Sequence, residues 1–173
     1  MIRIFDFFFS LLGLIFLSPL LILLLILGLF NNGSHLFMQK RVGKFQKTFV
    51  LVKFRTMPIA VKSVGTHLIK DIKLSAYGYF LRRTKLDELP QLFNVLIGDM
   101  SLVGPRPCLL NQIKLISERK KRGIFKVKPG ITGLAQISAI NMRTPTLLSK
   151  TDLKMIKKMS LSNYFYYILR TIL

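Results

Sequence analysis

The sequence has few of the side chains that bind transition metals or form cross-links. Its 173 residues include one cysteine, Cys108, and two histidines, His35 and His67. A single cysteine excludes an internal disulfide framework and a thiolate metal cluster, because each needs several thiols. Two histidines so far apart in sequence argue against a histidine zinc site. We therefore expect Cys108 to be a small packing residue.

Acidic side chains are also scarce. Seven Asp and Glu residues stand against 27 Lys and Arg, so the formal net charge at pH 7 is +20. Hydrophobic residues nevertheless make up 51% of the chain, and the mean hydropathy is +0.44. This combination excludes a disordered basic tail, which would be poor in apolar residues, and disfavours an ordinary soluble domain. The length corresponds to a single domain.

The apolar residues gather near the N-terminus, where no charged residue occurs from Phe7 to Phe30. A straight helix of that length would measure about 36 Å and could cross a hydrocarbon core of about 30 Å. The run is too long for a secretory signal and lacks its cleavage site. We expect a membrane segment over residues 1–30, with all the excess positive charge in a second region, 31–173. Positive-inside reasoning puts that region in the cytoplasm.

Ser18 and Pro19 fall near the middle of the membrane segment. Proline removes a helical hydrogen bond, so a bend is expected there. Two topologies stay open: a kinked single-pass helix, which proline alone favours, and a re-entrant helix that returns to the same leaflet. In the second, Ser18 or the adjacent fold must satisfy the freed carbonyls.

Beyond the membrane segment, the pattern predicts an α+β fold that is mainly helical and carries one small β-hairpin. The hairpin is expected over 38–54, with its turn at Gly43 and Lys44. We expect loops over 58–75 and over 98–107, and another loop that opens at Lys128-Pro129-Gly130. Helices are expected over 75–83, 85–97, 108–122 and 147–173, the last as one or two helices. In the last stretch, Lys150, Lys154, Lys157 and Lys158 share a helix face and 164–167 is Tyr-Phe-Tyr-Tyr. This favours contact with anionic headgroups over a solvated lysine face with tyrosines in a small core.

Asp87 and Glu88 are the only adjacent carboxylates in the sequence. If Asp87 caps a helix, Pro90 falls in the first turn and both carboxylates lie at a helix N-terminus, which attracts phosphate. An ionised aspartate there can act as a nucleophile, and a second carboxylate can hold Mg²⁺. An ordinary helix start, for which Asp and Glu are common, is the alternative.

Cations on both sides of the acidic pair favour phosphate chemistry. They are Arg82, Arg83, Arg106, Lys53 and Arg55. The planar guanidinium of arginine suits phosphate. An acidic pair among cations, next to a membrane, fits transfer of a phosphoryl group between a soluble and a lipid phosphate. The sequence contains no P-loop, no dinucleotide-binding glycine motif, no nucleophile elbow and no HExxH.

Six stretches carry a resemblance to a known family: RVGK at 41–44, KFRTM at 53–57, LRRT at 81–84, LDELPQLFNVL at 86–96, GDMSLVGPRP at 98–107 and KPGITG at 128–133. Together they resemble the bacterial sugar transferases, which are monotopic phosphoglycosyl transferases. The resemblance implies transfer of a sugar-1-phosphate from a UDP-sugar to a polyprenyl phosphate, usually undecaprenyl phosphate. It places the reaction at the cytoplasmic face of the bacterial inner membrane. It also implies a re-entrant membrane helix broken at Ser18-Pro19.

The same resemblance implies roles for individual residues. Asp87 would attack the β-phosphorus, UMP would leave, and a covalent phosphosugar intermediate would form before the lipid phosphate attacks. Glu88 would bind Mg²⁺, Arg106 would contact phosphate, and Arg82 would be needed near the pair. Anionic inner-leaflet lipids and downstream glycosyltransferases are further expected partners, and nucleic acid is not.

The chain departs from the family pattern at Leu134, Ala139, Met155 and Asn163. These departures leave the identity of the sugar open. Two other functions also stay open: a catalytically weak membrane scaffold of a glycan-assembly complex, and a membrane-tethered nucleic-acid binder suggested by the basic charge. Neither explains the basic charge, the broken membrane segment and the acidic pair together.

Overall fold

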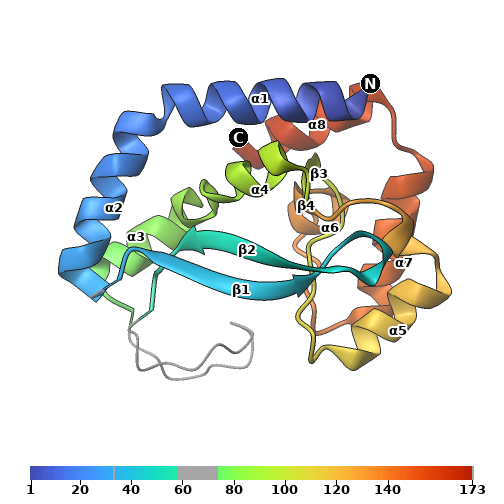
Figure 1. The fold of residues 1–173 in the computed structure, drawn as a ribbon. Coiled ribbons are helices and arrows are strands. Elements are labelled where there is room, and N and C mark those ends of the chain that lie inside the picture. The colour runs from blue at the N-terminus through green and yellow to red at the C-terminus, as the bar shows by residue number, and fades with distance from the viewer. Residues whose placement is uncertain (33, 58–73, 173) are drawn as a thin grey trace.

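The structure is a computed structural model that describes residues 1–32, 34–57 and 74–172. Its described residues form helices around two small sheets of two strands each (Figure 1). This confirms the predicted mixture of helices and strands, although the sequence predicted only one of the two sheets. Most of the loop predicted over 58–75 lies outside the described residues.

The N-terminal segment forms two helices, α1 (Ile2–Phe16) and α2 (Ser18–Asn32). The helix axis changes direction by 64° at the break between them. By length and hydropathy, no single described helix qualifies as a membrane span, and this bent pair qualifies only when taken together. Pro19 has no N–H to give the carbonyl of Ile15, and the Ser18 hydroxyl donates to that oxygen at 2.7 Å. The predicted bend is therefore present, and Ser18 satisfies a carbonyl at the break.

The two charged residues of α1 attach it to the rest of the protein. The Arg3 guanidinium donates to the carbonyls of Val95 (2.5 Å) and Leu96 (2.7 Å), at the C-terminal end of α4 (Gln91–Ile97). The buried Asp6 carboxylate accepts three hydrogen bonds: from the Ser101 hydroxyl at 3.0 Å, the Leu102 amide at 2.9 Å and the Tyr164 hydroxyl at 2.9 Å. Apolar side chains are left on the outer surface of α1, including Ile4, Phe8 and Phe16.

The predicted hairpin is confirmed, with β1 (Leu36–Val42) antiparallel to β2 (Thr48–Phe54) and a turn over residues 43–47 that includes the short helix η1 (Lys44–Gln46). Phe49 and Leu51 alternate inward on β2 and pack against Val95 and Met100. The outer edge of β2 is closed by a side chain, because the Asn94 amide accepts from the Val52 N–H at 3.0 Å and donates to the Val50 carbonyl at 2.8 Å.

A helix begins where predicted, as α3 (Ala76–Arg83), and the Ser75 hydroxyl caps it by accepting from the Gly78 N–H at 3.1 Å. The helix predicted over 108–122 is shorter, since α5 spans only Ile113–Lys121. Residues 108 and 109 extend the hairpin instead: the Val42 N–H donates to the Cys108 carbonyl at 3.0 Å, and Leu109 bridges to Arg41. As predicted, Cys108 is a buried packing residue.

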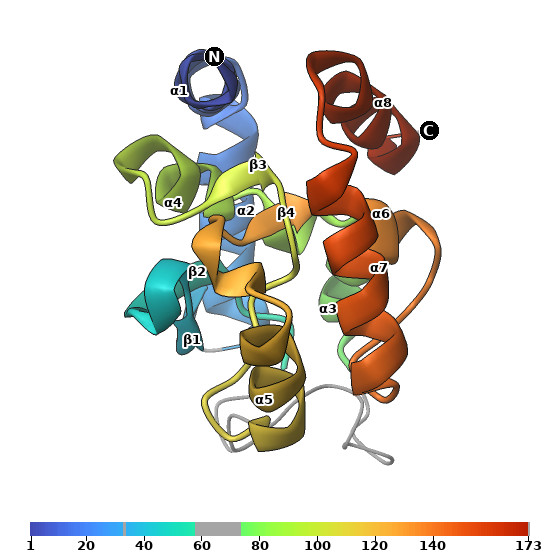
Figure 2. The same cartoon turned by 90° about the vertical axis from the view of Figure 1, so that its right-hand side faces the viewer.

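The second sheet lies within residues predicted as loops. Strand β3 (Ser101–Val103) pairs in parallel with β4 (Gly130–Thr132), which follows the short helix η4 (Ile124–Lys126). Three more helices complete the chain: α6 (Leu134–Ile137), α7 (Pro145–Lys157) and α8 (Leu161–Ile172). Figure 2, seen along α1, shows α1 and α8 side by side at one end of the molecule and α5 at the other.

The tyrosines of α8 differ from the sequence prediction. Tyr164 and Tyr167 are buried in a cluster with Val103 and Met155, and only Tyr166 is half exposed. Tyr164 lies inside because α8 packs beside α1 and β3, where its hydroxyl finds the Asp6 carboxylate. The four lysines of the predicted face are exposed, so their contact with anionic headgroups stays a prediction.

Candidate active site

A pocket of about 530 Å³ opens between the hairpin, the acidic pair and the C-terminal half of the chain. Its charged lining consists of five cations and one carboxylate: Arg41, Lys53, Lys85, Arg106, Arg170 and Glu88. Gln112, Gln136, Asn141 and Met142 line another part of it. Such a pocket attracts an anion with several negative charges and offers hydrogen-bonding groups to a polar molecule attached to it.

The acidic pair lies in a single 3-10 turn, η3 (Leu86–Glu88), and not inside a continuous helix. The predicted helix over 85–97 is broken because Pro90 lacks the N–H that would bond to the Leu86 carbonyl; the Leu89 N–H bonds to that oxygen instead, at 3.2 Å. Helix α4 starts at Gln91 with Pro90 in the capping position. Asp87 therefore does not cap a helix, which corrects the proposed reason for placing it at a helix N-terminus.

Asp87 lies in a partly dehydrated position. The residue is 7% exposed, and it is Glu88 that lines the pocket directly. Burial, followed by repulsion from Glu88, raises the pKa of Asp87 to about 6, while Lys53, Arg82 and Arg106 oppose that rise. At neutral pH, Asp87 is an ionised carboxylate with little water around it, which is the state that a nucleophile needs.

Two of the predicted phosphate-binding cations reach the pocket. Arg106 forms an ion pair with the Glu88 carboxylate. Lys53, near the end of β2, is half buried, and its burial lowers the pKa of its ammonium group to about 8 despite the attraction of Asp87. Both cations act electrostatically on Asp87, so the structure brings Lys53 and Arg106 together with the acidic pair.

The other predicted cations lie elsewhere. The Arg82 Nε donates to the Thr56 hydroxyl at 2.9 Å, and its charge still acts on Asp87. The Arg55 guanidinium stands 5.3 Å from the centre of the Phe37 ring and does not line the pocket. Ser18 and Pro19 belong to the bend between α1 and α2.

Sequence reasoning missed three cations that line the pocket: Arg41, Lys85 and Arg170. Arg41 comes from β1, and burial lowers its pKa to about 10. Lys85 adopts a left-handed backbone (φ 58°) and donates to the Thr171 carbonyl at 3.2 Å, which joins the acidic pair to α8. The sequence did offer a signal for Arg41, because this residue lies in the RVGK stretch that resembles the family. Arg170 reaches the pocket only through the packing of α8.

A metal ion would have to share its ligands with the substrate. Within the described ranges, no group of three or more His, Cys, Asp or Glu side chains is placed to hold a metal. Mg²⁺ is commonly bound by one or two carboxylates together with substrate phosphates and water. Glu88, whose side chain is 19% exposed and faces the pocket, fits that kind of site.

The comparisons with known proteins agree with this chemistry. The family model described as bacterial sugar transferase matches residues 1–173. The chain belongs to the bacterial sugar transferase family. This sugar transferase is 48% identical over 110 residues to the uncharacterized sugar transferase EpsL of Bacillus subtilis, which covers 63% of this chain and 54% of EpsL.

Two further relatives of this sugar transferase have names that state a reaction. It is 40% identical over 156 residues to the undecaprenyl-phosphate galactose phosphotransferase of Salmonella typhimurium, covering 80% of this chain and 33% of that protein. It is 42% identical over 152 residues to the UDP-glucose:undecaprenyl-phosphate glucose-1-phosphate transferase of Klebsiella pneumoniae, covering 84% of this chain and 32% of that protein. The sugar transferase therefore matches about half of EpsL and about a third of the other two.

Proposed function

We propose that this protein transfers a sugar-1-phosphate from a UDP-sugar to a polyprenyl phosphate. Undecaprenyl phosphate is the acceptor that we propose. The observation that carries the proposal is the dehydrated Asp87 carboxylate beside the Glu88–Arg106 ion pair, at a pocket with five cations. Family membership and the names of the Salmonella and Klebsiella relatives support the same reaction.

In the first step, an Asp87 carboxylate oxygen attacks the β-phosphorus of the UDP-sugar. A new phosphorus–oxygen bond forms to the carboxylate, and the bond from the β-phosphorus to the bridging oxygen breaks. UMP leaves with that electron pair, and the sugar phosphate stays on Asp87. Lys53 and Arg106 hold the diphosphate, and their positive charge offsets the charge on the departing phosphate.

In the second step, a phosphate oxygen of the polyprenyl phosphate attacks the same phosphorus. The acyl-phosphate bond breaks, the Asp87 carboxylate is restored, and the sugar leaves as a polyprenyl diphosphate derivative. Because the lipid phosphate is already nucleophilic, neither step needs a general base. The two substrates use the pocket in turn, which predicts ping-pong kinetics.

Mg²⁺ belongs to the proposal, with Glu88 as its protein ligand. When bound, the ion neutralises phosphate charge and orients the diphosphate. Arg106 already shares the Glu88 carboxylate, so this arginine keeps Glu88 turned toward the pocket and supplies a second positive charge next to it.

The membrane arrangement is part of the same proposal. We place α1 and α2 as a re-entrant pair in the bacterial inner membrane, with residues 31–173 on the cytoplasmic face, where anionic lipids and downstream glycosyltransferases are the expected neighbours. A cysteine at residue 2, in a Cys108→Ser background, tests it. Labelling from the cytoplasmic side alone is expected, and labelling from the periplasmic side would contradict a re-entrant pair.

The reaction is tested by UMP release from purified protein in nanodiscs, supplied with Mg²⁺, undecaprenyl phosphate and a panel of UDP-sugars. Release with at least one sugar is expected, and Asp87→Asn should abolish it. The matched control is Glu118→Gln, which removes a carboxylate of α5 that pairs with Arg122 outside the pocket. Without the lipid, radiolabel from the sugar phosphate should remain on the protein. Folded protein that releases no UMP with any sugar would favour the scaffold function.

A further inference from the structure

The loop from Gly104 to Cys108 presents Arg106 to the pocket. Arg106 is exposed, and the other four residues of the loop are buried. Pro105 and Pro107 flank it and restrict the backbone to a narrow range of φ. The direction of the Arg106 side chain therefore depends on this backbone as well as on its ion pair with Glu88.

Every carbonyl of this loop has a hydrogen-bond donor. The Gly104 carbonyl accepts from the Gln136 side chain at 3.4 Å, and the Pro105 carbonyl from a backbone N–H at 3.0 Å. The Pro107 carbonyl accepts from the Arg41 guanidinium at 3.1 Å, and the Cys108 carbonyl from a backbone N–H at 3.0 Å. The remaining carbonyl, that of Arg106 itself, accepts from Arg119 Nη1 at 2.7 Å.

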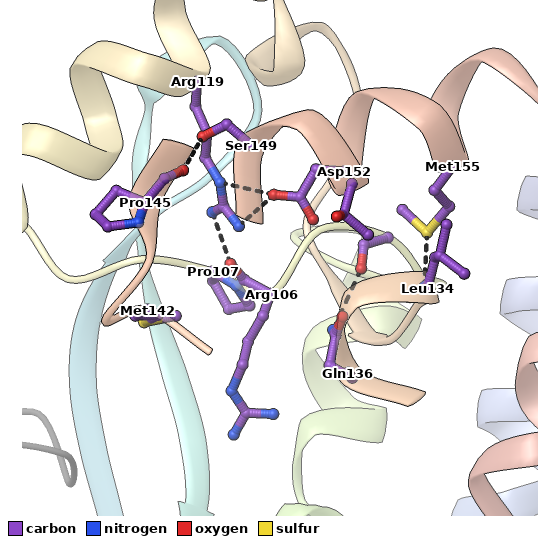
Figure 3. Close-up of polar contacts among 12 residues, drawn as sticks. Arg106, Pro107, Arg119, Leu134, Gln136, Met142, Pro145, Ser149, Asp152 and Met155 are labelled. Atoms are coloured by element: carbon purple, nitrogen blue, oxygen red, sulfur yellow. Dashed lines mark hydrogen bonds and ion pairs between the residues drawn. The ribbon is translucent and has the colours of Figure 1, made fainter. Parts of the chain in front are cut away.

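Arg119 reaches that carbonyl from the interior of the protein. Its side chain is 2% exposed, and its Nε and Nη2 donate to one carboxylate oxygen of Asp152 on α7, at 3.0 and 2.8 Å. Figure 3 shows the Arg119 guanidinium between Asp152 and the Arg106 carbonyl, while the Arg106 side chain points away from the pair. Three of the five Arg119 N–H groups are thus used in fixed directions.

Stability alone does not explain a buried pair of this kind. Removing two charges from water is costly, and well-packed apolar side chains of similar volume often stabilise a protein as well or better. Asp152 uses only one oxygen on Arg119, and its other oxygen is buried without a hydrogen-bond partner among the described residues. The pair does supply one specific contact: Arg119 Nη1 donates to the carbonyl of Arg106, and the side chain of Arg106 pairs with Glu88.

We infer that Arg119, oriented by Asp152, is a positioning residue that fixes the Arg106 backbone and so holds the Arg106 guanidinium at the substrate phosphates. This inference rests on the proposed function. Lysine is a poor substitute, because one ammonium group cannot donate along the three directions that the guanidinium uses. Misplacement of a substrate-orienting group by about 1 Å can cost about 100-fold in rate.

The test is a double-mutant cycle between Arg119→Lys and Arg106→Ala, measured as kcat/KM for UMP release and as Kd for UDP. Arg122→Lys is the matched control, because Arg122 also lies next to α5 and pairs with a carboxylate, Glu118, at 2.7 Å, away from the loop. We expect Arg119→Lys to lower kcat/KM by about 10- to 100-fold. The double variant should match Arg106→Ala, and Arg122→Lys should match the wild type.

A purely structural role predicts a different outcome. In that case Arg119→Lys would lower the thermal midpoint without lowering the activity of the folded fraction, or its fold-loss in kcat/KM would multiply with the fold-loss of Arg106→Ala in the double variant. Either result overturns the inference. If Arg119→Lys does not fold, Asp152→Asn carries the same cycle, because the amide has the size of the carboxylate but lacks the charge that holds the guanidinium. If the wild type releases no UMP, the proposed function fails, and the UDP affinities still decide the positioning role: Arg119→Lys must weaken UDP binding as Arg106→Ala does.

Discussion

Asn94 joins the helix after the acidic pair to the strand that carries Lys53. Its buried side-chain amide accepts from the Val52 N–H at 3.0 Å and donates to the Val50 carbonyl at 2.8 Å. Both backbone groups lie on the edge of β2 that has no strand beside it within the part of the chain that the structure describes. Replacing Asn94 with alanine removes both partners and leaves the two backbone groups without the amide.

The expected loss can be worked out from these two bonds. A buried polar group left without a partner costs about 1–3 kcal/mol, so two cost roughly 2–6 kcal/mol. For a domain of this size, 1 kcal/mol corresponds to about 2–4 °C in the thermal midpoint. Asn94→Ala should therefore lower the midpoint by roughly 4–24 °C, measured by thermal unfolding in one detergent at one scan rate.

Asn163→Ala provides the matched control for this measurement. The Asn163 side chain donates to the Lys158 carbonyl at 2.6 Å in an exposed position, where water can replace it. Its midpoint should stay within about 2 °C of the wild type, as for an ordinary surface change of about 0.5 kcal/mol. Equal midpoints for Asn94→Ala and the wild type, or equal losses in the two variants, would refute the reasoning.

Three further predictions follow from the site and the fold. With the pKa of Asp87 raised to about 6 and that of Lys53 lowered to about 8, kcat/KM should fall below pH 6 as the nucleophile is protonated and above pH 8 as the ammonium is lost; a flat profile from pH 5 to 9 would contradict these assignments. Gly130→Ala should prevent correct folding, because its Cβ would lie 2.0 Å from the backbone nitrogen of Gly104. Gly123→Ala is the control: the nearest atom to its Cβ is 3.7 Å away and only its φ is strained, so it should still give folded protein on gel filtration. Asp6→Ala, which leaves three donors without their carboxylate, should cost about 3 kcal/mol or more and expose α1 to limited proteolysis; resistance equal to that of the wild type would be the contrary result.

Local sequence patterns predicted the elements whose hydrogen bonds are local. The hairpin was predicted from the two strand-like runs around Gly43 and Lys44, and the start of α3 was predicted near Ser75. The pattern of leucines over 85–97 was misleading, because it remains helical in spacing across Pro90, where the backbone cannot continue. The parallel pair of β3 and β4 was not readable, since each strand has three residues and its partner lies almost thirty positions away.

The candidate site shows the same division. Asp87, Glu88 and Arg106 stand in contiguous motifs, so sequence alone singled them out. Arg170 comes to the pocket because α8 packs along α1 and β3, a long-range contact that no local pattern encodes. Two departures from the family pattern also meet only in three dimensions: the Leu134 N–H donates to the Met155 sulfur at 3.2 Å (Figure 3).

The Asp6 carboxylate has a consequence for the order in which the chain assembles. Its donors lie at residues 101, 102 and 164, so two belong to β3 and one to α8. During synthesis the first helix emerges long before Tyr164 exists, and domains form as their segments emerge from the ribosome. The Asp6 carboxylate of α1 therefore cannot be fully bonded until Tyr164 has been synthesised, so the docking of α1 against α8 is a late event in the folding of residues 1–172.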